Sequence, residues 1–182
     1  MSKIIEVDLN TDYLIGREKD KLDFWDVFQL ESGCLTIIPE PKDMMIAFFK
    51  SFPETFMWLL RLREWIARRL KLKTAPETDE KSRLEKLHNF KGNIGESIAV
   101  FDVLERSERE LVTGQKDSHL DFKLAFISYR EADRIVMQMA TTVIINNVVG
   151  KMYFAIVKPI HKYYMRKIFK RMEMTLLNKD WE

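Results

Sequence analysis

Cysteine and histidine are scarce in this sequence, which has one Cys and three His among its 182 residues. The single thiol, Cys34, cannot form an internal disulfide, and such cysteine usage is typical of a reducing cytoplasm. Cys34 and the histidines lie far apart in the sequence, without the ligand spacing of a zinc site. We therefore expect a cytoplasmic protein that binds no metal ion.

Long apolar runs are also absent. The longest stretch without a charged residue, 135–150, contains Gln138 and Asn146 among other polar residues. It falls short of the roughly 18 apolar residues that a membrane helix needs. The N-terminal MSKIIEVDLNTDY carries Glu6 and Asp8 and lacks the apolar core of a signal peptide. We expect neither a leader nor an integral membrane segment.

A charge excess of either sign is missing as well. Thirty Lys and Arg face 28 Asp and Glu, for a net charge of +2, which gives no overall drive toward nucleic acid or an anionic membrane. The chain contains no G-x-G-x-x-G, P-loop, RNA-binding motif or G-x-S-x-G. We expect no nucleotide cofactor and no nucleic-acid partner.

The residues that are present favour one globular domain spanning 1–182. Hydrophobic residues make up 46% of the chain and aromatic residues 12%, which argues against disorder. A chain of this length can bury about 70% of its unfolded surface and so form a real core. The stretch at about 73–93 is polar and highly charged, and we expect it to be a linker or an exposed loop.

The order of predicted elements indicates an α+β fold. Strand patterns are followed by two helices, then by several alternating apolar and polar segments that predict an antiparallel sheet with one buried face, and finally by a long helix. Only the sheet offers this last helix a place to bury its apolar side, which we take to include Met152, Ile156 and Ile168. We predict strands at 4–9, 22–30, 97–104, 110–115, 119–130 and 134–148, and helices at 43–52, 53–72 and 151–178.

Four segments resemble a bacterial family catalogued as a domain of unknown function, number 2867. They are DFWDVF (23–28), FFKSFPETFMWLLRLREWIARRLKLK (48–73), ELVTGQKDSHLDFKL (110–124) and TTVIINNVVGKMYFAIVKPIH (141–161). The HLDF motif and the T-x-V-x-x-N-x-x-G series are the most specific of these. Lys123 and Lys151 stand where the family pattern has Arg, and Ile160 where it has Phe; all three changes are conservative.

The family in turn resembles the START-like superfamily, which includes polyketide cyclases and lipid-transfer proteins. That resemblance implies a helix-grip fold, in which a curved antiparallel sheet wraps around the long C-terminal helix, with two helices inserted after the first strand region. It also implies an apolar ligand held between sheet and helix. Related domains occur joined to NAD-binding domains of the short-chain reductase type, but without G-x-G-x-x-G this cofactor role is not transferred.

Asp26 and His161 are the candidate catalytic residues. Asp26 shares its strand parity with Phe24 and Phe28, so a cavity-lining face would place a carboxylate among aromatic rings, as a general acid or base or as a ligand anchor. The alternative is a cap or salt bridge at a strand edge. His161 shares one face of the last helix with Tyr153 and Val157, as a polar rim of a ligand channel or as an ordinary core stripe.

Further residues carry alternative interpretations. Trp58 lies on an apolar helical stripe and either lines the pocket or belongs to the core, so the candidate ligand-binding set is Phe24, Phe28, Trp58, Tyr153, Val157 and His161. The alternation of LDFKLAF places His119 and Asp121 on the face opposite Leu120, Phe122 and Leu124. Asn147 and Gly150 are expected to form the strand-to-helix junction, where Asn147 can hydrogen-bond its own turn and Gly150 permits a left-handed backbone.

Three functions are compatible with these patterns. The first is a protein that binds a small apolar or amphipathic ligand without a cofactor. The second is an enzyme of the cyclase, hydrolase or isomerase type that uses Asp26 or His161 as acid or base. The third is an accessory module that docks on a protein partner through the basic stripe of the last helix, which includes Lys158, Lys162 and Arg166, and through the aromatic strand at 22–30.

Overall fold

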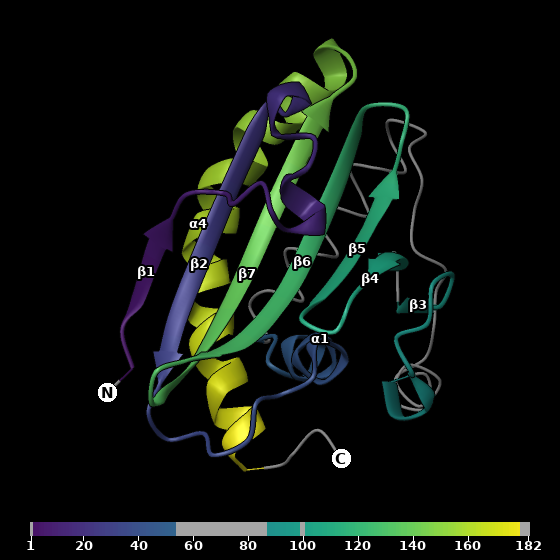
Figure 1. Cartoon of the computed structure of the whole chain (residues 1–182). Coiled ribbons are helices and arrows are strands. Elements are labelled where there is room, and N and C mark those ends of the chain that lie inside the picture. The colour runs from purple at the N-terminus through teal and green to yellow at the C-terminus, as the bar shows by residue number, and fades with distance from the viewer. Residues whose placement is uncertain (1, 54–86, 99–100, 179–182) are drawn as a thin grey trace.

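The computed structural model of the chain describes residues 2–53, 87–98 and 101–178. These residues form one seven-stranded antiparallel sheet and a long C-terminal helix (Figure 1). This α+β arrangement is the predicted one and is consistent with a helix-grip-like fold. The first inserted helix is present, whereas the second predicted helix, at 53–72, falls almost wholly outside the described residues.

The strands follow the order β1-β2-β7-β6-β5-β4-β3 across the sheet, and every neighbouring pair is antiparallel. The central strands β6 and β7 are the longest, with twelve residues each, and their register sets the frame on which the rest is built. The strand bounds are β1 Ile4–Val7, β2 Phe24–Ser32, β3 Ser97–Ile98, β4 Phe101–Arg106, β5 Glu110–Lys116, β6 Leu120–Glu131 and β7 Arg134–Ile145.

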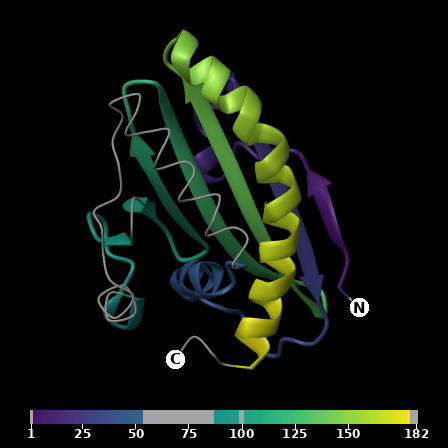
Figure 2. The same ribbon diagram turned by 180° about the vertical axis from the view of Figure 1, so that it is seen from behind.

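Helices α1 and α4 lie on the same face of the sheet, as Figure 2 shows. Helix α1 (Pro41–Lys50) begins with Pro41, which has no N–H to leave unsatisfied in the first turn. Helix α4 (Val148–Leu177) crosses the sheet and runs unbroken through Pro159. The main core lies between these helices and the sheet, where Phe28, Phe126 and Phe169 are among the fully buried side chains.

The opposite face of the sheet is covered by the N-terminal segment. Leu9 and Ile15 pack there against Val27, Val112 and Ala140 in a smaller core. This segment includes the short 3-10 helices η1 (Leu14–Gly16), with Ile15 and Gly16 buried, and η2 (Lys19–Lys21). The carboxylate of Glu110 accepts hydrogen bonds from the backbone N–H groups of Leu14 and Ile15, at 2.6 and 2.9 Å.

The junction between β7 and α4 differs from its prediction. The strand ends at Ile145 and the helix begins at Val148, so Gly150 lies inside the first helical turn and not in a left-handed conformation. A Cβ atom on Gly150 would lie 1.9 Å from the carbonyl oxygen of His119, so glycine is required here by close packing. The predicted role of Asn147 is confirmed, because its side chain accepts a hydrogen bond from Gly150 N at 3.0 Å.

Part of the stretch predicted as a polar linker is packed into the core. Within 73–93 the structure describes residues 87–93, and there Leu87 and Phe90 are buried in the main core cluster. Because charged residues surround Leu87 and Phe90 in the sequence, the composition of this stretch did not predict their burial. The domain boundary prediction of one unit over 1–182 stays a prediction.

Candidate functional site

Asp26 and His161 lie side by side between the sheet and the first half of α4. Nε2 of His161 is 3.3 Å from Oδ1 and 3.2 Å from Oδ2 of Asp26, and it forms its hydrogen bond with Oδ1. Asp26 is only 5% exposed, and the His161 side chain is 19% exposed. The two residues proposed separately from the sequence thus form one carboxylate–imidazole pair, 135 positions apart in the chain.

Strand pairing explains why Asp26 faces the helix. In β2 it alternates with Phe24 and Phe28, both of which are buried on the side where α4 packs. Successive side chains of a strand point to opposite faces, so Trp25, on the other parity, is exposed. The predicted parity that Asp26 shares with Phe24 and Phe28 is therefore confirmed. Asp26 is paired, as the alternative interpretation expected, but its partner is His161 and it does not lie at a strand edge, since β2 lies between β1 and β7.

Thr141 is a member of the site that sequence reasoning missed. It is the direct cross-strand partner of Asp26 in the β2–β7 ladder, which places the two side chains on one face about 5 Å apart at Cβ. Its hydroxyl is buried and has no hydrogen-bond partner among the described residues, and the same holds for Asp26 Oδ2. The available signal was a polar residue within the apolar parity of Met137, Met139 and Val143.

Apolar side chains surround this polar group. The ring of Phe24 lies 5.0 Å from that of Phe154 on α4 and 6.5 Å edge-on from the imidazole of His161. Phe24, Leu120 and Val143 form a buried cluster against which Tyr153 and Phe154 of α4 pack. The ammonium group of Lys158 lies over the Phe24 ring, 4.9 Å from its centre.

The remaining predicted ligand-binding residues are distributed unevenly around the pair. Phe28 is fully buried in the main core, with the guanidinium group of Arg166 5.6 Å from its ring. Val157 is half-buried on α4, one helical turn before His161. Tyr153 contacts His119, and Trp58 lies outside the described residues.

His119 does not lie on the outer face of the sheet as predicted. It is 4% exposed, its ring packs edge-on against Tyr153 of α4 at 5.3 Å, and its Nδ1 is 3.5 Å from Asp117 Oδ2. Strand β6 begins only at Leu120, so the alternation that placed His119 does not extend to it. Asp121, within the strand, instead accepts hydrogen bonds from Asp117 N and the Asn146 amide, at 3.2 and 3.1 Å.

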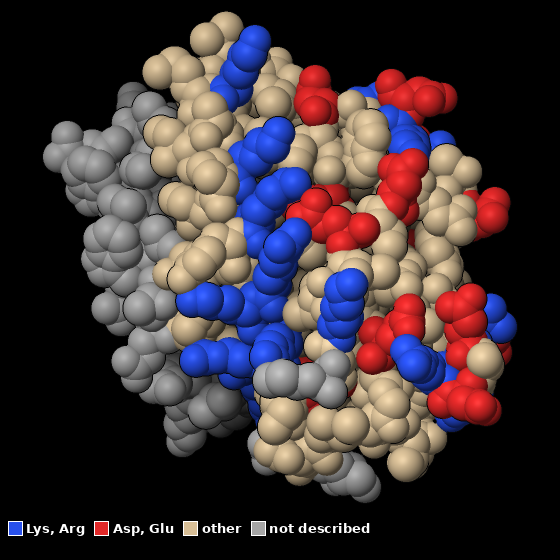
Figure 3. Space-filling model, turned by 90° about the vertical axis from the view of Figure 1, so that its left-hand side faces the viewer, with Lys and Arg blue, Asp and Glu red and all other residues tan. Residues whose placement is uncertain are grey.

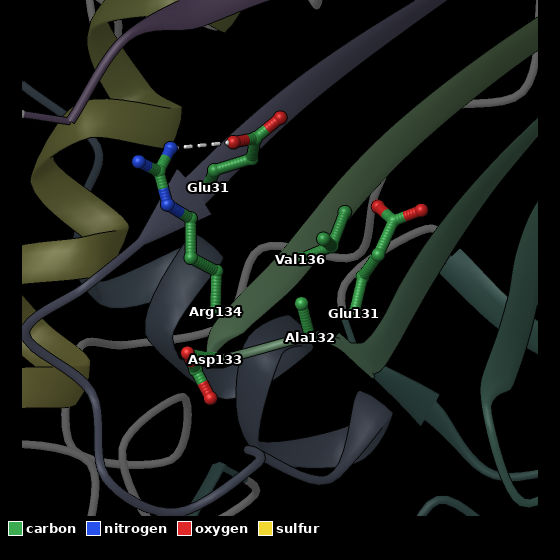
Figure 4. A pocket seen from close by; sticks show the side chains of 6 residues that line it. All are labelled: Glu31, Glu131, Ala132, Asp133, Arg134 and Val136. Carbon is green, nitrogen blue, oxygen red and sulfur yellow. Dashed lines mark hydrogen bonds and ion pairs between the residues drawn. The ribbon is translucent and has the colours of Figure 1, made fainter.

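A separate pocket lies at the turn between β6 and β7 (Figure 4). It has a volume of about 320 Å³ and is lined by Glu31, Glu131, Ala132, Asp133, Arg134 and Val136. Arg134 donates to Glu31 at 2.9 Å. Glu31 is five residues along β2 from Asp26, which corresponds to about 17 Å of strand, so this pocket is not part of the Asp26 site.

Comparison with models of protein families identifies the family of this chain. The model of the family described as "Protein of unknown function (DUF2867)" matches residues 19–168, which is 150 of the 182 residues. The chain belongs to this family. The match includes Asp26, Thr141 and His161, so the whole candidate site of this DUF2867 protein lies within the family region. No curated protein and no solved structure matches the chain.

Proposed function

We propose that this DUF2867 protein is a START-like, helix-grip domain that binds a small, mostly apolar molecule between the sheet and the first half of α4. The observation that carries the proposal is the polar group formed by buried Asp26 and Thr141 and half-buried His161 within an apolar surrounding. Most small-molecule sites are apolar with a few convergent polar groups. The order of strands and the long helix across the sheet support the same interpretation.

The polar group also defines what the ligand must offer. The Thr141 hydroxyl is buried without a hydrogen-bond partner among the described residues, and Asp26 Oδ2 likewise accepts no hydrogen bond there, although Nε2 of His161 lies 3.2 Å away. A buried polar group left without a hydrogen bond costs about 1–3 kcal/mol. The carboxylate can only accept, so a ligand hydroxyl or amine N–H that donates to Oδ2 would remove this cost. The proposed ligand is therefore amphipathic, with an apolar body and at least one donor group.

Native mass spectrometry of freshly purified protein tests this proposal. We expect a mass excess over the bare chain that disappears on denaturation and is strongly reduced in Asp26→Asn. The matched control is Asp20→Asn, which makes the same chemical change at an exposed position of η2 and should keep the mass excess. A wild-type mass equal to that of the bare chain would count against ligand binding.

The Asp26–His161 geometry also favours a second candidate function, acid–base catalysis on the bound molecule. A carboxylate beside one ring nitrogen orients the imidazole and fixes its tautomer, which leaves Nδ1 available to take or give a proton. The partial exposure of His161 allows a reacting molecule to approach it. If the co-purified molecule is a product, His161→Gln should carry a different molecule, the unreacted substrate, whereas in a pure binding protein the variant should carry the same molecule or none.

A further inference from the structure

Apolar side chains on the first half of α4 face solvent. Val148, Met152 and Ile156 are 73%, 68% and 63% exposed, and Tyr163 is 56% exposed. Their spacing of four, four and seven residues keeps them on one side of the helix. This outward row corrects the prediction that Met152 and Ile156 bury against the sheet. Contiguous exposed apolar residues of this kind mark interaction surfaces.

The same helix carries almost all of its charge as cations. Between Val148 and Met172 it has no acidic residue but seven Lys and Arg: Lys151, Lys158, Lys162, Arg166, Lys167, Lys170 and Arg171. Figure 3 shows basic side chains in a column along this side of the molecule, beside uncharged surface. Glu6 of β1 pairs with Arg166 at 2.7 Å and with Lys162 at 3.6 Å. Because this single carboxylate offsets only one positive charge, the column remains strongly cationic.

Charge is thus separated within a nearly neutral chain. The seven cations of α4 and its one acid, Glu173, give the helix a charge of +6. Because the whole chain carries +2, the remaining residues carry −4. Glu173 is buried and accepts a hydrogen bond from Ser2, so it does not offset the cations at the surface. A planar anionic partner would attract this face and repel the rest of the molecule.

We propose that the outward face of α4 docks on the surface of an anionic lipid bilayer. The apolar row would enter the headgroup region while the flanking lysines and arginines contact lipid phosphates, as in interfacial amphipathic helices. Among the described residues, no helix is long and apolar enough to cross a membrane, so the docking is peripheral. Nucleic acid fits less well, because its phosphates leave Val148, Met152 and Ile156 without an apolar environment.

Vesicle flotation with the full chain tests the proposal. The expected result is binding to phosphatidylcholine vesicles that contain phosphatidylserine, no binding to pure phosphatidylcholine, and weakening as salt is raised. The double variant Lys170→Gln/Arg171→Gln should lower the partition coefficient roughly thirty-fold, from about fivefold for each cation near the surface. Met152→Gln/Ile156→Gln should weaken binding to phosphatidylserine vesicles without changing its salt dependence.

The matched control is Arg109→Gln/Lys116→Gln, which removes two exposed cations of the sheet side and should leave vesicle binding unchanged. All substituted positions are exposed, so circular dichroism should show the native fold in every variant. Absence of binding to phosphatidylserine vesicles would overturn the proposal, as would an equal loss in the control. Binding to polyglutamate without binding to vesicles would overturn it in favour of an acidic protein partner.

Discussion

The two halves of α4 meet the sheet in different ways. In the second half, Met165, Ile168, Phe169 and Met172 are buried in the main core cluster together with residues of β2, β6, β7 and α1. In the first half the inward side carries His161, half-buried Tyr153 and Val157, and the outward side carries the exposed apolar row. One continuous helix therefore anchors the fold at one end and presents a polar pair and an exposed apolar row at the other. Apolar burial stabilises the second half, whereas the first half retains groups suited to binding.

The largest expected difference concerns stability. Phe169→Ala removes a fully buried ring from the second half of α4 and should lower the free energy of unfolding by about 3–5 kcal/mol. Ile156→Ala, in the first half, removes an exposed side chain and should change it by less than about 0.5 kcal/mol. Urea denaturation of both variants measures the contrast. Similar losses in the two variants would show that the first half is as tightly packed as the second.

The difference between the two halves of α4 could be predicted from the sequence only in part. The strand parity of Asp26 and the helical face of His161 were readable from the sequence, because both depend on local periods of two and 3.6 residues. The contact between these two side chains could not be predicted, because it depends on the position of α4 along β2 in the tertiary structure. Met152 and Ile156 were placed on the wrong side for a different reason. At 3.6 residues per turn Met152 lies about 160° around the helix axis from the buried Ile168, so one face of α4 cannot bury both.

Predictions from local sequence patterns also failed for His119 and Gly150, which lie where a strand or a helix begins. His119 precedes β6 and is held under the first turn of α4, where its carbonyl oxygen accepts from Asn146 N. Strand alternation says nothing about a residue outside the strand, so its burial against Tyr153 needed the tertiary structure. Gly150 shows a similar limit, because the close approach of the His119 carbonyl cannot be inferred from the junction sequence alone.

A second difference concerns Asp26 and Asp43, two of the buried carboxylates on the helix-covered side of the sheet. Asp26 has the imidazole of His161 beside it, whereas for Asp43 of α1 burial is the dominant influence and raises the pKa of its carboxyl to about 6. A raised pKa in the folded state means that stability is fully present below the unfolded value of about 3.9 and is lost as pH rises through about 6. The shift corresponds to roughly 3 kcal/mol.

Asp43→Asn cannot ionise and should not show this loss. The free energy of unfolding should therefore fall more steeply from pH 4 to pH 7 in the wild type than in Asp43→Asn. Asp20→Asn, at an exposed position, should follow the wild type and controls for the loss of one negative charge. Parallel pH profiles of the wild type and Asp43→Asn would contradict the assignment.

The smallest effect tests whether the polar group of the first half is kept for binding. Thr141→Val nearly preserves shape and deletes a buried hydroxyl that has no partner among the described residues, so it should leave the unfolding free energy unchanged or raise it by about 1 kcal/mol. Thr113→Val is the matched control, because the Thr113 hydroxyl donates to the Leu124 carbonyl at 3.2 Å. That variant should lose about 1 kcal/mol.

If Thr141 binds the ligand's polar group, Thr141→Val should also reduce the co-purified mass excess while Thr113→Val retains it. A stabilised protein with weakened binding is the expected signature of a residue that serves function at a cost to the fold. Destabilisation of Thr141→Val by as much as Thr113→Val would instead show that the Thr141 hydroxyl is satisfied within the protein. The polar group would then be part of the structure, and the search for the ligand's donor partner would narrow to Asp26 and His161.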